Sequence, residues 1–143
     1  MSGNSESIRL PARLESLHPL LAFAASCAQK RGIGPARIQE IELALEELLV
    51  NIFNYAYPDR PGEVALSCGD GDSGGMRIEI ADEGVEFNIL NREDPDLDAG
   101  IEARAVGGLG IFFVKQLIGD IRYRREKGQN ILTLAVDPAP ASS

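Results

Sequence analysis

The sequence is poor in the residues that build metal centres and disulfide frameworks. Its 143 residues contain no tryptophan, one histidine (His18) and two cysteines, Cys27 and Cys68. The cysteines stand in apolar surroundings and fit no metal-binding spacing. We therefore expect two reduced, buried thiols, as is usual in cytosolic proteins.

Long hydrophobic runs are missing as well. No apolar stretch approaches the roughly 20 residues that cross a bilayer. Residues 1–7 lack the basic start and the apolar core of an export signal. These absences predict a soluble, cytoplasmic protein without membrane contact.

Positive charge is scarce. The 22 Asp and Glu residues outnumber the 14 Lys and Arg residues, and the net charge is −8. Phosphate backbones favour a basic protein face, so this balance argues against nucleic acid as the main partner. An acidic surface suits a basic protein partner, although solubility alone would explain it equally well.

The hydrophobic pattern predicts one α+β domain of two layers. Helical spacing of apolar residues covers 12–31, continues from Pro35 to about Tyr57, and returns over 108–118. Strands are predicted over 8–10, 63–67, 76–81, 121–126 and 130–136. We expect a sandwich in which a mixed, mostly antiparallel sheet carries the helices on one face.

The domain is expected to span residues 8–136. Residues 1–7 are predicted to be a flexible N-terminus, and the Pro-, Ala- and Ser-rich residues 137–143 a disordered tail. The acidic, aperiodic stretch 83–107 is too long for a simple connection. We expect it to be functional or mobile.

Glu47 and Asn51 form the first polar cluster of interest. They lie four residues apart in the second predicted helix, so both side chains project from one side of it. An apolar stripe from Ile38 to Ile52 holds the opposite side in the core. Near a sheet such a pair serves water, a metal or a ligand, unless it belongs to an ordinary exposed polar face.

Two further clusters follow along the chain. Asp82 ends a predicted strand, and Gly84 lets the backbone approach a flat ligand closely, although a plain Asp/Gly turn has the same pattern. The glycine-rich segment 107–110 leads directly into the third predicted helix. The N–H groups and the dipole of a helix start favour a phosphate. A flexible connector is the alternative for that segment.

The order of these clusters resembles the nucleotide-binding fold of the GHKL superfamily (gyrase, Hsp90, histidine kinase, MutL). The matches are the N-box (Glu47 to Asn51), the G1 box (Asp82 to Gly84), the ATP lid (86–106) and the G2 box (Gly107 to Gly110). Within the superfamily, residues 8–136 are most similar to the anti-sigma-factor serine kinases of partner-switching systems.

The resemblance implies ATP and Mg²⁺ as cofactors and a role for each matched residue. Glu47 would be the general base for an attacking serine hydroxyl, and Asn51 would bind Mg²⁺. Asp82 would accept a hydrogen bond from the adenine amino group, with Gly84 leaving room for the ring. Thr133 would support the adenine through water. The residues that would wrap the phosphates are Gly107, Gly108, Leu109 and Gly110.

The resemblance also implies partners. The protein would bind a sigma factor or an analogous regulatory target, phosphorylate a serine of a STAS-domain antagonist, and form a homodimer near its N-terminal strand and first helix. Glu86 stands where a second glycine is usual, and Tyr55 where many relatives carry histidine. The alternatives are a nucleotide-binding module that sequesters a partner without phosphoryl transfer, and the catalytic domain of a sensor kinase. His18 lacks the acidic flank of a phosphoacceptor, so we interpret it as structural.

Overall fold

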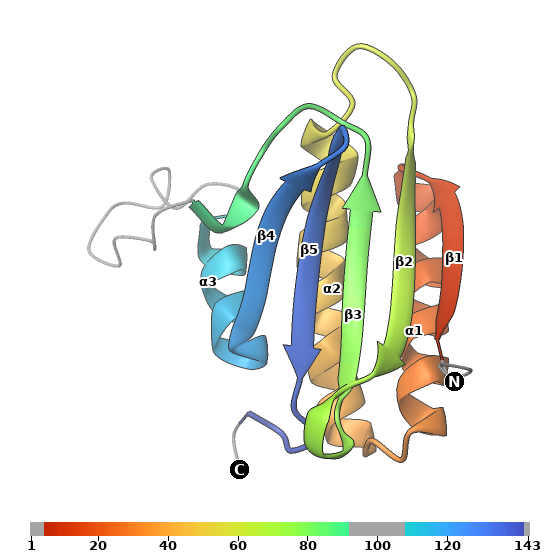
Figure 1. Ribbon diagram of the computed structural model, residues 1–143, viewed down its shortest axis with the longest axis vertical. Helices are drawn as coiled ribbons and strands as arrows, with labels where there is room; N and C mark the ends of the chain where they lie inside the picture. The colour runs from red at the N-terminus through yellow and green to blue at the C-terminus, as the bar shows by residue number, and fades with distance from the viewer. Residues whose placement is uncertain (1–4, 92–107, 142–143) are drawn as a thin grey trace.

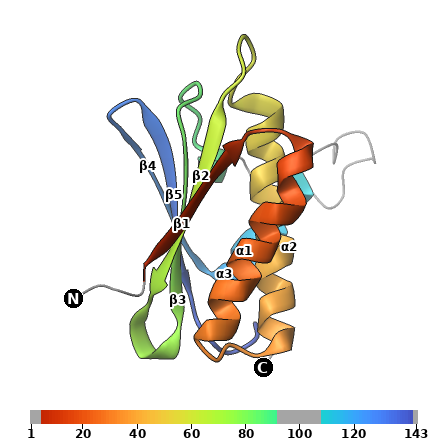
Figure 2. The same ribbon diagram turned by 90° about the vertical axis from the view of Figure 1, so that its right-hand side faces the viewer.

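Three helices lie against one face of a five-stranded antiparallel sheet in the part of the chain that the structure describes, residues 5–91 and 108–141 (Figures 1 and 2). The structure is a computed structural model. The strands follow the order β1-β2-β3-β5-β4 across the sheet. The strands are β1 (Glu6–Pro11), β2 (Glu63–Asp70), β3 (Met76–Asp82), β4 (Asp120–Glu126) and β5 (Gln129–Val136), and the helices are α1 (Leu17–Lys30), α2 (Pro35–Tyr55) and α3 (Gly108–Ile118).

The predicted α+β class, with helices on one face of the sheet, is confirmed. The sheet is antiparallel at every described strand pair, where the sequence had allowed a mixed one. The first helix begins at Leu17, after a 3₁₀ turn (Leu14–Ser16), and not at residue 12. The reason is that the backbone N–H of Ala12 still donates to the carbonyl of Gly62, so the chain stays extended beyond β1.

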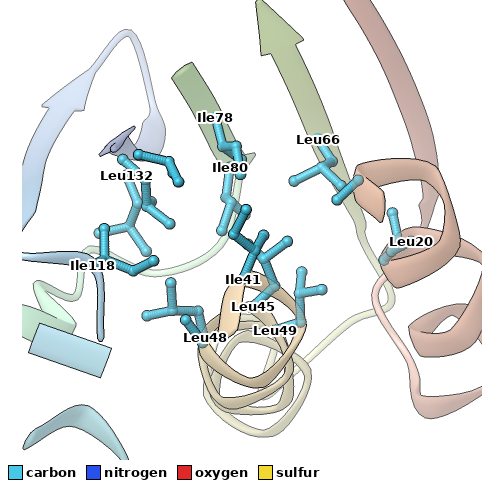
Figure 3. Packing of buried hydrophobic residues seen from close by; sticks show 14 of the residues in the cluster. Leu20, Ile41, Leu45, Leu48, Leu49, Leu66, Ile78, Ile80, Ile118 and Leu132 are labelled. Atoms are coloured by element: carbon cyan, nitrogen blue, oxygen red, sulfur yellow. The ribbon is translucent and has the colours of Figure 1, made fainter. Parts of the chain in front are cut away.

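The core lies between the sheet and the helices and is almost entirely aliphatic. The buried face of α2, including Ile41, Leu45 and Leu48, packs against Leu66 of β2 and the isoleucines of β3 (Figure 3). The helical spacing of the apolar residues in α2 and the alternation of the apolar residues in the strands therefore produce one continuous apolar layer. In the described residues no helix combines the length and the apolarity that a membrane crossing needs.

Both thiols are buried and free, as the sequence predicted. Cys27 on α1 donates from its Sγ to Glu6 Oε1 at 3.4 Å. Burial raises the pKa of both the Cys27 and the Cys68 thiols. A thiol held protonated in this way is a poor nucleophile, so the pair is part of the core.

A buried arginine connects the start of α2 to the end of α3. Arg37, near the start of α2, donates from Nη1 to the carbonyl of Leu117, near the end of α3, at 2.7 Å. Its Nε donates to the carbonyl of Asp137 at 2.8 Å, and its Nη1 also pairs with Glu40. The backbone N–H of Ala141 donates to the same Glu40 carboxylate. The disorder of residues 137–143 stays a prediction. Of these residues, Asp137 and Ala141 are hydrogen-bonded to the side chains of Arg37 and Glu40 on α2.

Candidate functional site

Glu47 and Asn51 project from α2 as a connected pair. Asn51 is only 4% exposed, which does not fit an ordinary exposed polar face. Its Nδ2 donates to the backbone carbonyl of Glu47 at 2.7 Å and to Glu47 Oε2 at 2.9 Å. The amide therefore holds the carboxylate in a fixed position, one helical turn away.

The first turn of α3 packs directly against the Glu47 carboxylate. A Cβ added at Gly110 would overlap the carboxyl group of Glu47. A side chain at position 110 would therefore displace the Glu47 carboxylate from its present place. The contact places Glu47 beside the N–H groups of a helix start, where negative groups are stabilised.

Asp82 is the buried carboxylate at the end of β3. It is 5% exposed, and its Oδ1 accepts hydrogen bonds from the backbone N–H of Gly84 and from Asn130 Nδ2, both at 2.9 Å. Burial raises the pKa of the Asp82 carboxyl, and these two hydrogen bonds oppose that rise. Among the described residues no hydrogen bond reaches its second oxygen, Oδ2, so this atom is available to accept a hydrogen bond from a ligand.

Asn130 completes the site, and sequence reasoning missed it. It stands opposite Asp82 in the β3–β5 register. Its Nδ2 also donates to the carbonyl of Val85 at 2.8 Å, and its Oδ1 accepts from Tyr123 Oη at 2.6 Å and Arg125 Nη1 at 3.1 Å. One buried amide thus fixes both Asp82 and the turn after it. Asparagine is uncommon in strands, and its place at the start of an apolar strand was the available signal.

Gly84 brings the end of β3 onto the end of α2. A Cβ at Gly84 would overlap the carbonyl of Ala56, and the N–H of Val85 donates to that carbonyl at 2.9 Å. The sequence had predicted that Gly84 leaves room for a flat ligand. The structure shows that the close approach is between two backbone segments, which draws Asp82 toward Asn51.

A small cavity with a free volume of about 20 Å³, room for about one water molecule, lies between α2, β3, β5 and the turn after β3. Asn51 and Asp82 both line it, and most of its other walls are apolar or aromatic. A concave apolar site with a few polar groups is typical of small-molecule binding. The lining residues are Asn51, Ile52, Ala56, Asp82, Val85, Phe87, Ile89, Tyr123, Asn130 and Leu132.

Thr133 does not join this site. It lies on β5 three residues after Asn130, so its side chain is on the other face of the sheet. There its Oγ1 donates to Glu79 Oε2 at 3.4 Å and accepts from Arg124 Nη1 at 3.3 Å. The position beside Asp82 belongs to Asn130 and not to Thr133.

The two departures from the family pattern lie outside the cavity lining. Glu86 is exposed, and Tyr55 is half-exposed with its ring 6.3 Å from that of Phe87. His18 is exposed on α1. The predicted lid (86–106) lies mostly outside the described residues, as does Gly107. α3 begins at Gly108, as predicted.

No group of three or more His, Cys, Asp or Glu side chains suited to a metal ion occurs in the described ranges. Mg²⁺ in phosphoryl-transfer sites is usually held by one or two side chains, by several waters and by the substrate phosphates. The Asn51 side chain offers the amide oxygen for that role.

The fold and the cavity define an ATPase domain. The family model described as the histidine kinase-like ATPase domain matches residues 10–136, and the chain belongs to this family. Membership implies ATP binding. The chain is 27% identical to the serine-protein kinase RsbW of Bacillus cereus (strain AH820) over 129 residues, which cover 87% of this chain and 80% of that protein. The RsbW proteins of Bacillus anthracis (strain A0248) and Bacillus thuringiensis (strain Al Hakam) match with the same identity and coverage.

Replacing Asp82 by Asn should weaken ATP and ADP binding by about 1–3 kcal/mol, because a buried hydrogen bond to a charged acceptor is lost. Calorimetry on the purified protein measures this. The control is Asp120→Asn, an exposed carboxylate at the start of β4, which should leave the affinity unchanged. Equal affinities in the wild-type protein and Asp82→Asn would rule out the adenine contact.

Proposed function

We propose that this protein is an anti-sigma factor and a serine-protein kinase. It binds a sigma factor or an analogous regulatory protein, and it phosphorylates a serine of a STAS-domain antagonist with ATP. One observation carries the proposal. A buried amide, Asn51, holds the carboxylate of Glu47 against the glycine-rich start of α3, next to a cavity that contains Asp82.

Each side chain has a defined task in the proposed reaction. Asp82 Oδ2 would accept a hydrogen bond from the adenine amino group, and Asn51 would hold Mg²⁺ through its amide oxygen. The start of α3, with Gly108 and Gly110, faces the phosphates. When bound, ATP supplies the phosphoryl group and Mg²⁺ offsets its charge.

Glu47 acts on the attacking serine of the partner. Its carboxylate accepts the hydroxyl proton while the serine oxygen bonds to the γ-phosphorus and the bond to the ADP oxygen breaks. The chain's contribution is positioning and a fixed base, as phosphoryl transfer requires. The name of the RsbW relatives, serine-protein kinase, supports this reaction.

The structure also bears on the alternative, a nucleotide-binding module without phosphoryl transfer. The reason for that alternative was Glu86, a carboxylate near the nucleotide. Glu86 is exposed and does not line the cavity that holds Asp82. Burial and the nearby charge of Glu86 raise the pKa of Tyr123, a residue that does line the cavity, so the transfer experiment decides between the two functions.

A homodimer is part of the proposal, with β1 near the interface. β1 is an edge strand of the sheet, so its outer backbone groups are available for pairing. Leu17, Leu21 and Phe23 of α1 are partly buried and pack against the protein's own core.

Incubation with γ-labelled ATP, Mg²⁺ and the STAS-domain protein encoded nearest to this chain tests the kinase. We expect label on one serine of that protein, and none when the serine is replaced by Ala. Binding of the STAS-domain protein without any transfer of label would support the sequestering module and refute the kinase.

A further inference from the structure

Two large apolar side chains beside Glu47 are left in solvent. Leu43 on α2 is 56% exposed and Phe113 on α3 is 54% exposed. Single exposed apolar residues are ordinary on protein surfaces. A pair on two neighbouring helices next to a candidate active site needs a different explanation.

Two contacts show how α2 and α3 run relative to each other. Near the start of α3, Gly110 lies against Glu47, and near its end the carbonyl of Leu117 accepts from Arg37. The helices are therefore antiparallel, with the start of α3 beside the middle of α2. Figure 1 shows the two helices side by side behind the sheet.

This arrangement brings Leu43 and Phe113 to the same level. Leu43 precedes Glu47 by one helical turn, and Phe113 follows Gly110 by about one turn. Because the two helices are antiparallel, both residues lie on the same side of the contact between Gly110 and Glu47 along the helix axes. Their neighbours Ala44 and Val114 are fully buried on the sheet side. Leu43 and Phe113 consequently border the outer side of the seam between α2 and α3.

The α2 side of this surface is acidic, whereas the one charged residue of α3 is the basic Lys115, two residues after Phe113. After Arg37, α2 carries Glu40, Glu42, Glu46 and Glu47 and no lysine or arginine. Glu40 is paired with Arg37, whereas Glu46 is exposed one residue before Glu47. A partner that covers this surface meets two apolar side chains flanked by negative charge on the α2 side.

We propose that Leu43, Phe113 and Glu46 form the docking surface for the serine-bearing protein substrate. This inference rests on the proposed function. A serine that gives its proton to Glu47 has to come within hydrogen-bond reach of that carboxylate. The rest of its protein then lies over the adjoining seam. The occupant is a segment whose serine is flanked by an apolar side chain and a basic residue, which match the apolar pair and the carboxylate.

The experiment compares Leu43→Ser, Phe113→Ser and Glu46→Lys with the wild-type protein. Leu14→Ser is the matched control, since Leu14 is 67% exposed in the 3₁₀ turn before α1. The probe is the STAS-domain protein encoded nearest to this chain. For each of the three variants we expect KM and Kd for the probe to rise about tenfold, as for truncated interface anchors. The kcat, the ADP affinity and the unfolding temperature should stay unchanged, and the control should match the wild type.

Unchanged KM and Kd in all three variants would overturn the docking surface. So would a parallel loss of ADP affinity, which would assign the effect to the nucleotide cavity. A dimer that dissociates in the variants, seen by light scattering, would instead make this seam a contact between two copies. Wild-type protein that binds the probe without phosphorylating it refutes the kinase, while the Kd comparison still decides the docking surface. Wild-type protein that neither binds nor phosphorylates the probe would overturn both the kinase and the docking surface.

Discussion

Glu47→Gln is expected to lower phosphoryl transfer by about 10²–10⁴-fold, the usual contribution of a general base. The carbonyl oxygen of the new side chain still accepts the hydrogen bond from Asn51 Nδ2, which the wild-type Oε2 accepts at 2.9 Å. The position of the side chain therefore stays the same while its basicity is lost. Single-turnover transfer from labelled ATP to the STAS-domain protein measures the effect.

Two controls keep this result specific. ADP affinity should change little in Glu47→Gln, because Glu47 is not among the residues that line the cavity. Glu42→Gln, on the same helix, should transfer label at the wild-type rate. Full activity in Glu47→Gln would mean that the base is another residue or the substrate itself.

Gly110→Ala should damage the site from the opposite side. The new methyl group would overlap the Glu47 carboxylate, so either α3 or Glu47 has to move. The carboxylate is the free end of a flexible side chain, so Glu47 can move aside, and we expect the free energy of unfolding to change by less than about 1 kcal/mol, the difference in helix propensity between Gly and Ala. Transfer should fall by about 10²-fold, because catalytic positioning tolerates little displacement.

The matched substitution is Gly69→Ala. A Cβ at Gly69, in β2, meets nothing nearer than Ser5 Oγ at 4.0 Å, so stability and transfer should both be kept. Chemical denaturation and the transfer assay give the two numbers for each variant. If Gly110→Ala retained full transfer, α3 would not be held against Glu47 in the working protein.

Helical spacing is enough to find the pair on α2. Residues four apart on a helix share one side, so their positions in the chain already place Glu47 and Asn51 together. The start of α3 at Gly108 is equally predictable, because three glycines enter an apolar helix there. Both inferences depend only on neighbours along the chain.

The partners across the sheet were not predictable in the same way. Asn130 faces Asp82 only because β5 pairs with β3 in one register, and a shift by one residue would turn its side chain to the other face. Nothing local to β5 sets that register. The family resemblance implied that Thr133 of the same strand supports the adenine through water, and its side chain lies on the face of the sheet opposite to Asn130. The contact between Gly84 and Ala56 likewise joins segments that the sequence does not relate.

The hydrogen bond of Arg37 holds the C-terminal end of α3, so a tilt of this helix would move its glycine-rich start most. The Arg37 guanidinium donates a hydrogen bond to the carbonyl of Leu117, near the end of α3, and Gly119 follows with a φ of +85°. The 11 residues of α3 span about 16 Å, so a tilt of about 10° around that pivot displaces the first turn by about 3 Å. Phe113 sits midway along the helix and would travel roughly half as far. A tilt of α3 at its glycine-rich start would therefore also move an exposed side chain on the protein surface.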